Sequence, residues 1–318
     1  MKISALVPVK NLDTAKSRLA DVLSRNERRM LADLMLSDVV EVILKNPKIE
    51  KVFLVGDKQL SPKSGTFIIQ EKFNNGYNEA ISFALRDKRI ANSDAIVILP
   101  GDIPLITTEE IENFINDAPK NGIRIAPDRD REGTNALLLA PPTLIKTQFG
   151  KLSYSRHLEL AEKFYLEQIS DLRNNNAGII AFTPMFADVD RFGGDEIFAS
   201  WVKDNGIVLS STTSQKGMRS VAPHVGTATL GNGDANTFAY KYKSVVNNIH
   251  SKSSDGAGML SSSPEVDGSV RRIPLVISVD NKLYPSFGME VVRVMADKKS
   301  YTMKVEETGI ENMRIPPY

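Results

Sequence analysis

The segment "AIVILPGDIPLITTEEI" (95–111) carries the clearest signal for the fold. An apolar run at 95–99 ends in a proline, and Gly101 and Asp102 follow directly. A short apolar run that stops at a turn is typical of a strand buried on both faces. Thr107 and the glutamates after it predict a helix start, because threonine caps helices and acidic residues favour the first turn. Asp102 either caps the turn or holds a ligand, and the local sequence favours neither.

Similar apolar runs flank this segment, and stretches with helical spacing separate them. The expected strands are 3–9, 51–57, 66–70 and 95–102, and the expected helices are 25–44, 76–90 and 107–118. Apolar strands that alternate with helices predict an α/β fold with a mostly parallel sheet covered on both faces. Ligands of such sheets bind at the carboxyl ends of the strands. Lys10, Asp57 and Asp102 are therefore expected along one edge.

The rest of the chain is less regular. Two strands joined by a polar turn are expected at 122–142, a helix at 153–169, and a strand, an acidic turn and a short helix at 178–206. We expect one α/β domain over residues 1–209. Residues 210–270 are rich in Ser, Gly, Asn and Thr, which predicts a linker or loose region. Residues 271–318 resemble a small β-rich appendage of unknown role.

Composition excludes several classes of protein. The 318 residues contain 40 basic and 39 acidic side chains, so no overall field attracts nucleic acid or an anionic membrane. The absence of cysteine excludes disulfides, thiolate zinc sites and a cysteine nucleophile. The three histidines have no metal-ligand spacing, so a histidine-rich metal site is not expected. We see no signal peptide or membrane span, and expect a cytoplasmic protein.

A basic cluster follows the first expected strand in "VPVKNLDTAKSRLA" (7–20). Lys10, Lys16, Ser17 and Arg18 lie near a helix start, where free N–H groups also favour anions. The glycines of a Walker A loop are missing. The cluster is either a phosphate site or a solvated surface loop.

Two later segments also contain candidate ligands. In "FGKLSYSRH" (149–157), Gly150 and Ser153 precede a helix, where a serine is a cap or an anion ligand. In "ADVDRFGGDEI" (187–197), Asp188 and Asp190 point the same way if they end a strand. Such a pair favours a divalent cation, although a simple turn also explains it.

The features together favour one chemistry more than each does alone. A basic loop after the first strand can hold a triphosphate. A carboxylate after a central strand and an Asp-Val-Asp motif late in the domain can hold Mg²⁺ at the reacting phosphate. This combination predicts a site that holds a triphosphate and Mg²⁺.

The order of the motifs resembles that of the 2-phospho-L-lactate guanylyltransferases of coenzyme F-420 biosynthesis. The resemblance covers residues 1–208 and rests on "VPVKNLDTAKSRLA", "ERRMLADLMLSDVV", "LPGDIPL", "PDRDREGTNALLL", "FGKLSYSRHLELA" and "ADVD". It implies a Rossmann-like, glycosyltransferase-A-like nucleotidyltransferase domain. It also implies transfer of GMP from GTP to 2-phospho-L-lactate, phosphoenolpyruvate or 3-phosphoglycerate, with release of pyrophosphate.

The resemblance also implies a role for individual residues. Asp102 and Asp188, with Asp190 beside them, match the Mg²⁺ ligands. The acceptor's carboxylate and phosphate are assigned to Thr134, Gly150 and Ser153. The nucleotide is assigned to Lys10, Lys16, Ser17, Arg18, Gly76 and Asn78, with Lys16 and Arg18 also counted as catalytic. Tyr77 and Glu79 depart from the small residues common beside Gly76 and Asn78. His157 is expected to support the structure or to touch the acceptor.

Several alternatives stay open at this point. The chain could be a molybdopterin-type or sugar-nucleotide nucleotidyltransferase, although their glycine-rich first loop is missing. It could also be a non-catalytic GTP-binding regulatory protein whose C-terminal region acts on a partner. A homodimer and contact with the downstream transferase of the pathway are further expectations from the resemblance.

Overall fold

The computed structural model describes residues 1–9, 15–56, 60, 63–71, 76–116, 118–189, 194–214, 222–261 and 273–315. The chain divides into two compact units, 1–161 and 162–318. Lys10, Asp57 and Asp190 lie outside the described residues. We describe each unit by itself.

The first unit is built on a six-stranded sheet in the order β3-β2-β1-β4-β6-β5. Its strands are β1 (Ile3–Pro8), β2 (Ile49–Gly56), β3 (Thr66–Gln70), β4 (Ala95–Ile98), β5 (Gly122–Pro127) and β6 (Thr134–Ala140). The first four strands are parallel, whereas β6 runs antiparallel to both β4 and β5. The predicted α/β fold with a mostly parallel sheet is confirmed.

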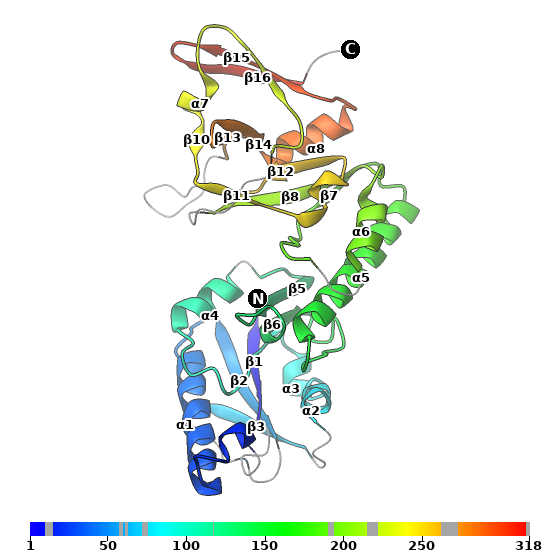
Figure 1. Ribbon diagram of the computed structural model, residues 1–318. Coiled ribbons are helices and arrows are strands. Elements are labelled where there is room, and N and C mark those ends of the chain that lie inside the picture. The colour runs from blue at the N-terminus through cyan, green and yellow to red at the C-terminus, as the bar shows by residue number, and fades with distance from the viewer. Residues whose placement is uncertain are drawn as a thin grey trace. The chain divides into compact units, whose positions relative to one another are not determined.

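Helices cover both faces of this sheet (Figure 1). They are α1 (Arg25–Leu44), α2 (Tyr77–Ala84), α3 (Lys88–Ala91) and α4 (Thr108–Ile115), with a 3-10 turn η1 (Ser17–Leu19) before α1. Buried side chains of α1 and α4 pack in one core cluster and those of α2 and α3 in another. Capping boxes start α1 at Ser24 and α4 at Thr107, so the predicted role of Thr107 is confirmed.

The single helix that was expected at residues 76–90 is two helices in the structure. Residues 76–90 form α2 and α3 because the Asp87 carboxylate accepts a hydrogen bond from the Arg89 N–H and starts a new helix there. Beyond the sheet, α5 (Ser153–Asn174) begins in the first unit and continues into the second, past the expected end at residue 169.

The second unit is rich in short strands. β8 pairs with β7, β11 and β12, while β10-β13-β14 and β16-β15-β9 form two three-stranded sheets. The strands are β7 (Ile180–Phe182), β8 (Ile207–Ser214), β9 (Thr227–Leu230), β10 (Tyr240–Lys241), β11 (Ser244–Asn247), β12 (Gly256–Met259), β13 (Val276–Val279), β14 (Lys282–Pro285), β15 (Tyr301–Glu306) and β16 (Gly309–Arg314). The helices are α6 (Gly194–Val202), α7 (Ala235–Phe238), η2 (Ile249–Lys252) and α8 (Phe287–Met295).

This arrangement differs from the expected boundary at 209 and from the expected loose region at 210–270. The described residues of that region form strands because some of the glycines serve close packing. A Cβ on Gly258 would lie 2.6 Å from the Phe287 Cα of α8, and one on Gly256 would lie 2.6 Å from the Glu290 carboxylate. β12 therefore packs directly on α8. The sequence had predicted a linker here because the residues are small.

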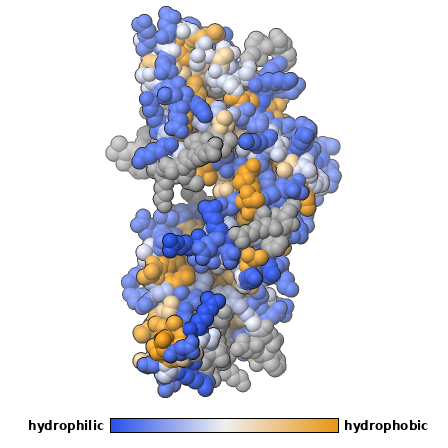
Figure 2. Space-filling model, viewed as in Figure 1, coloured by the Kyte–Doolittle hydropathy of each residue, from blue (hydrophilic) through white to orange (hydrophobic). Residues whose placement is uncertain are grey.

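The surface is mostly hydrophilic in the view of Figure 2, with a few apolar patches. One such patch lies in the region of α1, the helix on which Met30 and Leu34 are 65% and 59% exposed. Among the described residues, every helix is too short or too polar to cross a lipid bilayer.

Candidate active site

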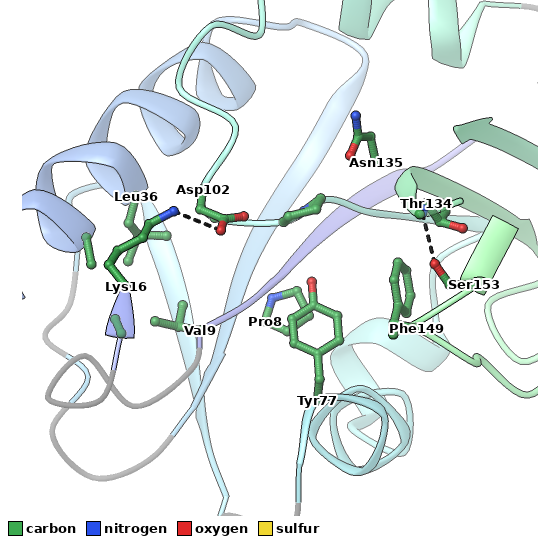
Figure 3. Close-up of a pocket in the computed structure, with 16 residues that line it drawn as sticks. Pro8, Val9, Lys16, Leu36, Tyr77, Asp102, Thr134, Asn135, Phe149 and Ser153 are labelled. Atoms are coloured by element: carbon green, nitrogen blue, oxygen red, sulfur yellow. Dashed lines mark hydrogen bonds and ion pairs between the residues drawn. The ribbon is translucent and has the colours of Figure 1, made fainter. Parts of the chain in front are cut away.

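A pocket of about 350 Å³ lies in the first unit where β1 and β4 end. Its lining includes Pro8, Lys16, Asp102, Thr134 and Ser153. The carboxyl edge of a parallel sheet is where ligands of α/β proteins bind, because loops and helix starts converge there. Figure 3 shows Lys16 and Asp102 on one side of the pocket and Thr134 and Ser153 on the other.

Lys16 and Asp102 form an ion pair that water can reach. The Lys16 ammonium donates to Asp102 Oδ2 over 3.0 Å, and the side chains are 24% and 59% exposed. Lys16 has a left-handed backbone (φ 53°) at the start of η1. An exposed pair of this kind contributes at most about 1 kcal/mol to stability, so either group can exchange its partner for a ligand at little cost.

Thr134 and Ser153 form the opposite wall and are almost fully buried. The Thr134 N–H donates to Ser153 Oγ over 2.9 Å. His157 Nε2 accepts from the Gln148 N–H, so Nδ1 carries the ring proton and donates to Thr134 Oγ1 over 2.9 Å. Both hydroxyl oxygens therefore accept a hydrogen bond from the protein. Each hydroxyl therefore still has its own proton, which it can donate to another acceptor.

Burial of His157 keeps this arrangement in one protonation state. Its ring is fully buried, and burial lowers the pKa of His157 to about 4. A neutral imidazole can donate at one nitrogen and accept at the other, which both bonds require. His157 thus positions Thr134, as the structural expectation for this residue anticipated.

Two backbone features hold the wall in place. The Asp128 carboxylate accepts hydrogen bonds from the N–H groups of Glu132 and Gly133, both over 2.9 Å, and so shapes the turn before Thr134. Gly150 has φ 129°, a conformation that side chains disfavour, and its carbonyl accepts from the Ser153 N–H. The turn and Gly150 together fix the two hydroxyls.

Tyr77 forms the floor between the two walls, and its hydroxyl points into the pocket in Figure 3. Its pKa is raised, first by burial and then by the charge of Asp102, so the phenol keeps its proton. Beside it, Asn78 exchanges two hydrogen bonds with the Phe149 backbone (2.7 and 2.8 Å). Asn78 therefore holds the 149–150 loop, and its assignment to the nucleotide stays a prediction.

The other residues that the sequence predicted for the site differ in their exposure and in the unit to which they belong. Ser17 and Arg18 are exposed in η1, and Gly76 caps α2 with φ 107°. Asp188 is partly buried and belongs to the second unit. The predicted pairing of Asp102 with Asp188 therefore stays a prediction. Sequence reasoning gave no role to Tyr77 or Asn135, although Tyr77 stood out as unusual between Gly76 and Asn78.

Comparison with known proteins shows the family of this chain. Residues 3–171 match the family described as guanylyl transferase CofC like, and all the pocket residues lie in that range. The chain belongs to this guanylyltransferase family. A phosphoenolpyruvate guanylyltransferase of Sphaerobacter thermophilus is 33% identical over 198 residues, covering 61% of this chain and 94% of the relative. A 2-phospho-L-lactate guanylyltransferase of Methanocaldococcus vulcanius is 32% identical over 170 residues, covering 51% and 74%.

Among solved structures, a cytidylyltransferase from Leptospira borgpetersenii is 15% identical, with a TM-score of 0.33, over 54% of this chain and 73% of that one. The family match ends inside α5. The guanylyltransferase region thus corresponds largely to the first unit.

Within the described residues, one group of side chains has the composition and spacing to hold a metal ion. It consists of Glu162, Asp195 and His250, all in the second unit. None of the three was selected from the sequence.

Proposed function

We propose that this chain transfers GMP from GTP to a small phosphorylated acid and releases pyrophosphate, in coenzyme F-420 biosynthesis. The pocket supports this proposal because it offers a cation and a carboxylate on one wall and two directed hydroxyl donors on the other. The names of the relatives supply the acceptor class: phosphoenolpyruvate and 2-phospho-L-lactate. The third acid, 3-phosphoglycerate, comes from the resemblance of the motifs.

The acceptor is assigned to the wall of Thr134, Gly150 and Ser153. Each of the two hydroxyls accepts one hydrogen bond from the protein and has its own proton to donate, which favours a ligand group rich in acceptors, such as a carboxylate or phosphate. Burial strengthens these bonds, because water competes poorly there. Deletion of one donor would leave the anion short of a bond.

The nucleotide is assigned to the opposite wall, where Lys16 would contact the triphosphate. Asp102 fits a hard divalent cation, since its carboxylate is exposed to the pocket and offers two oxygens. Mg²⁺ bound there would neutralise charge on the reacting phosphates. Asp188 and Asp190 are the proposed further ligands, and Arg18 and Lys10 the proposed further cations.

The reaction needs charge neutralisation more than acid–base catalysis. The nucleophile is a phosphate oxygen that is ionised at neutral pH, so no side chain has to remove a proton. Two unit charges 4 Å apart repel by about 4 kcal/mol at an effective dielectric of 20. Lys16 offsets part of this repulsion, and the two hydroxyls aim the acceptor oxygen at the α-phosphorus, in line with the leaving pyrophosphate.

A pyrophosphate-release assay tests the proposal. The full chain is incubated with Mg²⁺ and GTP, and each of the three acids is added in turn. We expect release with at least one acid and much less with CTP or ATP. Release only with a sugar phosphate or with CTP would favour another nucleotidyltransferase of this fold. GTP binding without release under any acceptor or divalent metal would show a non-catalytic protein. Dimerisation, a cytoplasmic location and contact with a downstream transferase stay predictions.

A further inference from the structure

Three side chains from distant parts of the sequence meet inside the second unit. Glu162 lies on α5, Asp195 in the first turn of α6, and His250 in η2. One ligand atom from each lies within 4.8 Å of the other two. Glu162 is 1% exposed, His250 is 4% exposed, and Asp195 is partly buried. The group is thus internal, unlike the acidic clusters common on protein surfaces.

His250 aims its outer nitrogen at both carboxylates. Nε2 lies 3.4 Å from Asp195 Oδ1 and 3.6 Å from Glu162 Oε1, and it makes no hydrogen bond within the described part of the chain. Hydrogen bonds between a charged imidazole and a carboxylate are about 2.7–2.9 Å long, so both separations are too long for such bonds. The ring packs on Phe198 and Phe186, with centroid distances of 4.7 and 5.9 Å.

The separations fit ligands that share one ion. Nitrogen and oxygen ligands lie about 2.1 Å from Zn²⁺, and a tetrahedral arrangement at that length places neighbouring ligand atoms about 3.4 Å apart. An octahedral ion with the same bond length would bring adjacent ligands to about 3.0 Å. The observed 3.4 and 3.6 Å match the tetrahedral spacing.

We propose that Glu162, Asp195 and His250 bind a first-row divalent metal ion, with Zn²⁺ the best match. One imidazole and two carboxylates are a ligand set that suits zinc, and they leave a fourth position for water. Mg²⁺ fits less well, because it favours octahedral oxygen ligands and keeps several waters. This site is separate from the Mg²⁺ proposed for the nucleotide, and it does not depend on the guanylyltransferase activity.

The local chemistry supports the same conclusion. A neutral imidazole is the form that coordinates metals. A divalent cation would also carry a charge opposite to that of the two carboxylates, next to the Phe186 and Phe198 rings. Bound metal would hold α5, α6 and η2 together and stabilise the fold, because the ligands are dispersed in the unfolded chain.

Metal content of the full chain tests this proposal first. The protein is stripped with a chelator, given Zn²⁺ and dialysed, and its zinc is measured by mass spectrometry. We expect one tightly held Zn²⁺ per chain and a higher melting temperature. Glu162→Gln should weaken binding at least 10-fold and remove the thermal shift. Glu167→Gln, an exposed change on the same helix, should behave as the original chain. Asp102→Asn should also keep the ion, which excludes the nucleotide site.

Cobalt provides a second test that needs no variant. Co²⁺ in a near-tetrahedral site absorbs strongly in the visible range, whereas octahedral Co²⁺ absorbs weakly. We expect the strong bands with one equivalent of Co²⁺, and their loss when Zn²⁺ is added. A weak octahedral spectrum, or no saturable uptake of either metal, would overturn the proposal in favour of a histidine buried between two carboxylates. Equal zinc binding in Glu162→Gln would overturn it as well.

Discussion

The pocket of the first unit and the group of Glu162, Asp195 and His250 in the second unit differ in how far their charged side chains are exposed. Asp102 is 59% exposed and pairs with Lys16, whose ammonium water can also reach. Glu162 and His250 are almost fully buried, and Glu162 Oε1 lies 3.6 Å from His250 Nε2. The exposed pair contributes little to stability and can exchange partners, which suits a site that binds and releases substrates. Buried charges are costly unless compensated, which suits a permanent ligand.

A third charged group, around Glu290, shows how hydrogen bonds from protein side chains compensate a buried carboxylate. Glu290 of α8 is fully buried and accepts two hydrogen bonds from the Arg293 guanidinium, at 2.9 and 3.0 Å. The Tyr301 hydroxyl donates a third bond to it over 2.6 Å. These distances are those of real charge-assisted bonds. The contacts of His250 Nε2 with Asp195 and Glu162, at 3.4 and 3.6 Å, are longer than these bonds.

The largest expected effect is on activity at Asp102. Asp102→Asn should lower kcat/KM by about 10³-fold, because it removes a charge that the metal and the phosphates require. Stability should change by less than about 1 kcal/mol, since the pair with Lys16 is exposed. Initial rates of pyrophosphate release and thermal melting measure both. Asp21→Asn, at another exposed aspartate, is the control. A variant that unfolds would show that Asp102 serves structure.

The next effect concerns stability at Glu290. Glu290→Gln should destabilise the second unit by about 3–5 kcal/mol, because the Arg293 guanidinium would remain buried without its counter-charge. Denaturant melts followed by circular dichroism measure the loss. Glu307→Gln, at an exposed glutamate, provides the reference. A loss below 1 kcal/mol would show that the buried pair contributes less than its geometry indicates.

Acid should destabilise the first unit through His157. The unfolded chain binds a proton at this ring below about pH 6.5, whereas the folded chain binds one only near pH 4. Stability should therefore fall as the pH decreases between these values, by about 3 kcal/mol in total for this group. Melts at several pH values, compared with those of His157→Gln, measure the slope. An equally steep dependence in the variant would contradict the assignment.

The smallest effect is a selective one at Thr134. Thr134→Val should raise the KM for the acceptor about 10-fold and leave the KM for GTP nearly unchanged, because one donor to the anion is lost. Thr134→Ser keeps a hydroxyl and should retain most of the affinity. Steady-state kinetics with each substrate varied in turn provides the comparison. Equal effects on both substrates would place Thr134 outside the acceptor site.

The first unit was predictable because its signals are local. Buried parallel strands are continuous apolar runs, and α1 shows both a cap and a 20-residue periodic pattern. Asp102 and Ser153 were selected as candidates because one follows an expected strand and the other precedes an expected helix. Thr134 was assigned only through the resemblance of the motifs. Their hydrogen bonds to Lys16 and His157 depend on tertiary packing and could not be read from spacing alone.

The second unit was much less predictable. The glycines of β12 looked like linker residues, although they allow close contact with α8. α8 lies in the region that was expected to be β-rich, and it contains three valines, which favour strands. Glu162, Asp195 and His250 are dispersed along the chain, so no motif connects them. Metal sites are recognised in a sequence by short spacings between their ligands. Such spacings do not occur where the ligands come from three separate elements.

Isotope labelling of the acceptor's phosphate tests most directly whether this chain transfers GMP to that phosphate. Phosphoenolpyruvate or 2-phospho-L-lactate is labelled with ¹⁸O in its phosphate and incubated with GTP, Mg²⁺ and the full chain. We expect a guanosine diphospho-acid that retains all of the label, with unlabelled pyrophosphate, because the acceptor's oxygen attacks the α-phosphorus. Label in the pyrophosphate, or no guanylylated acid with any of the acids, would contradict it.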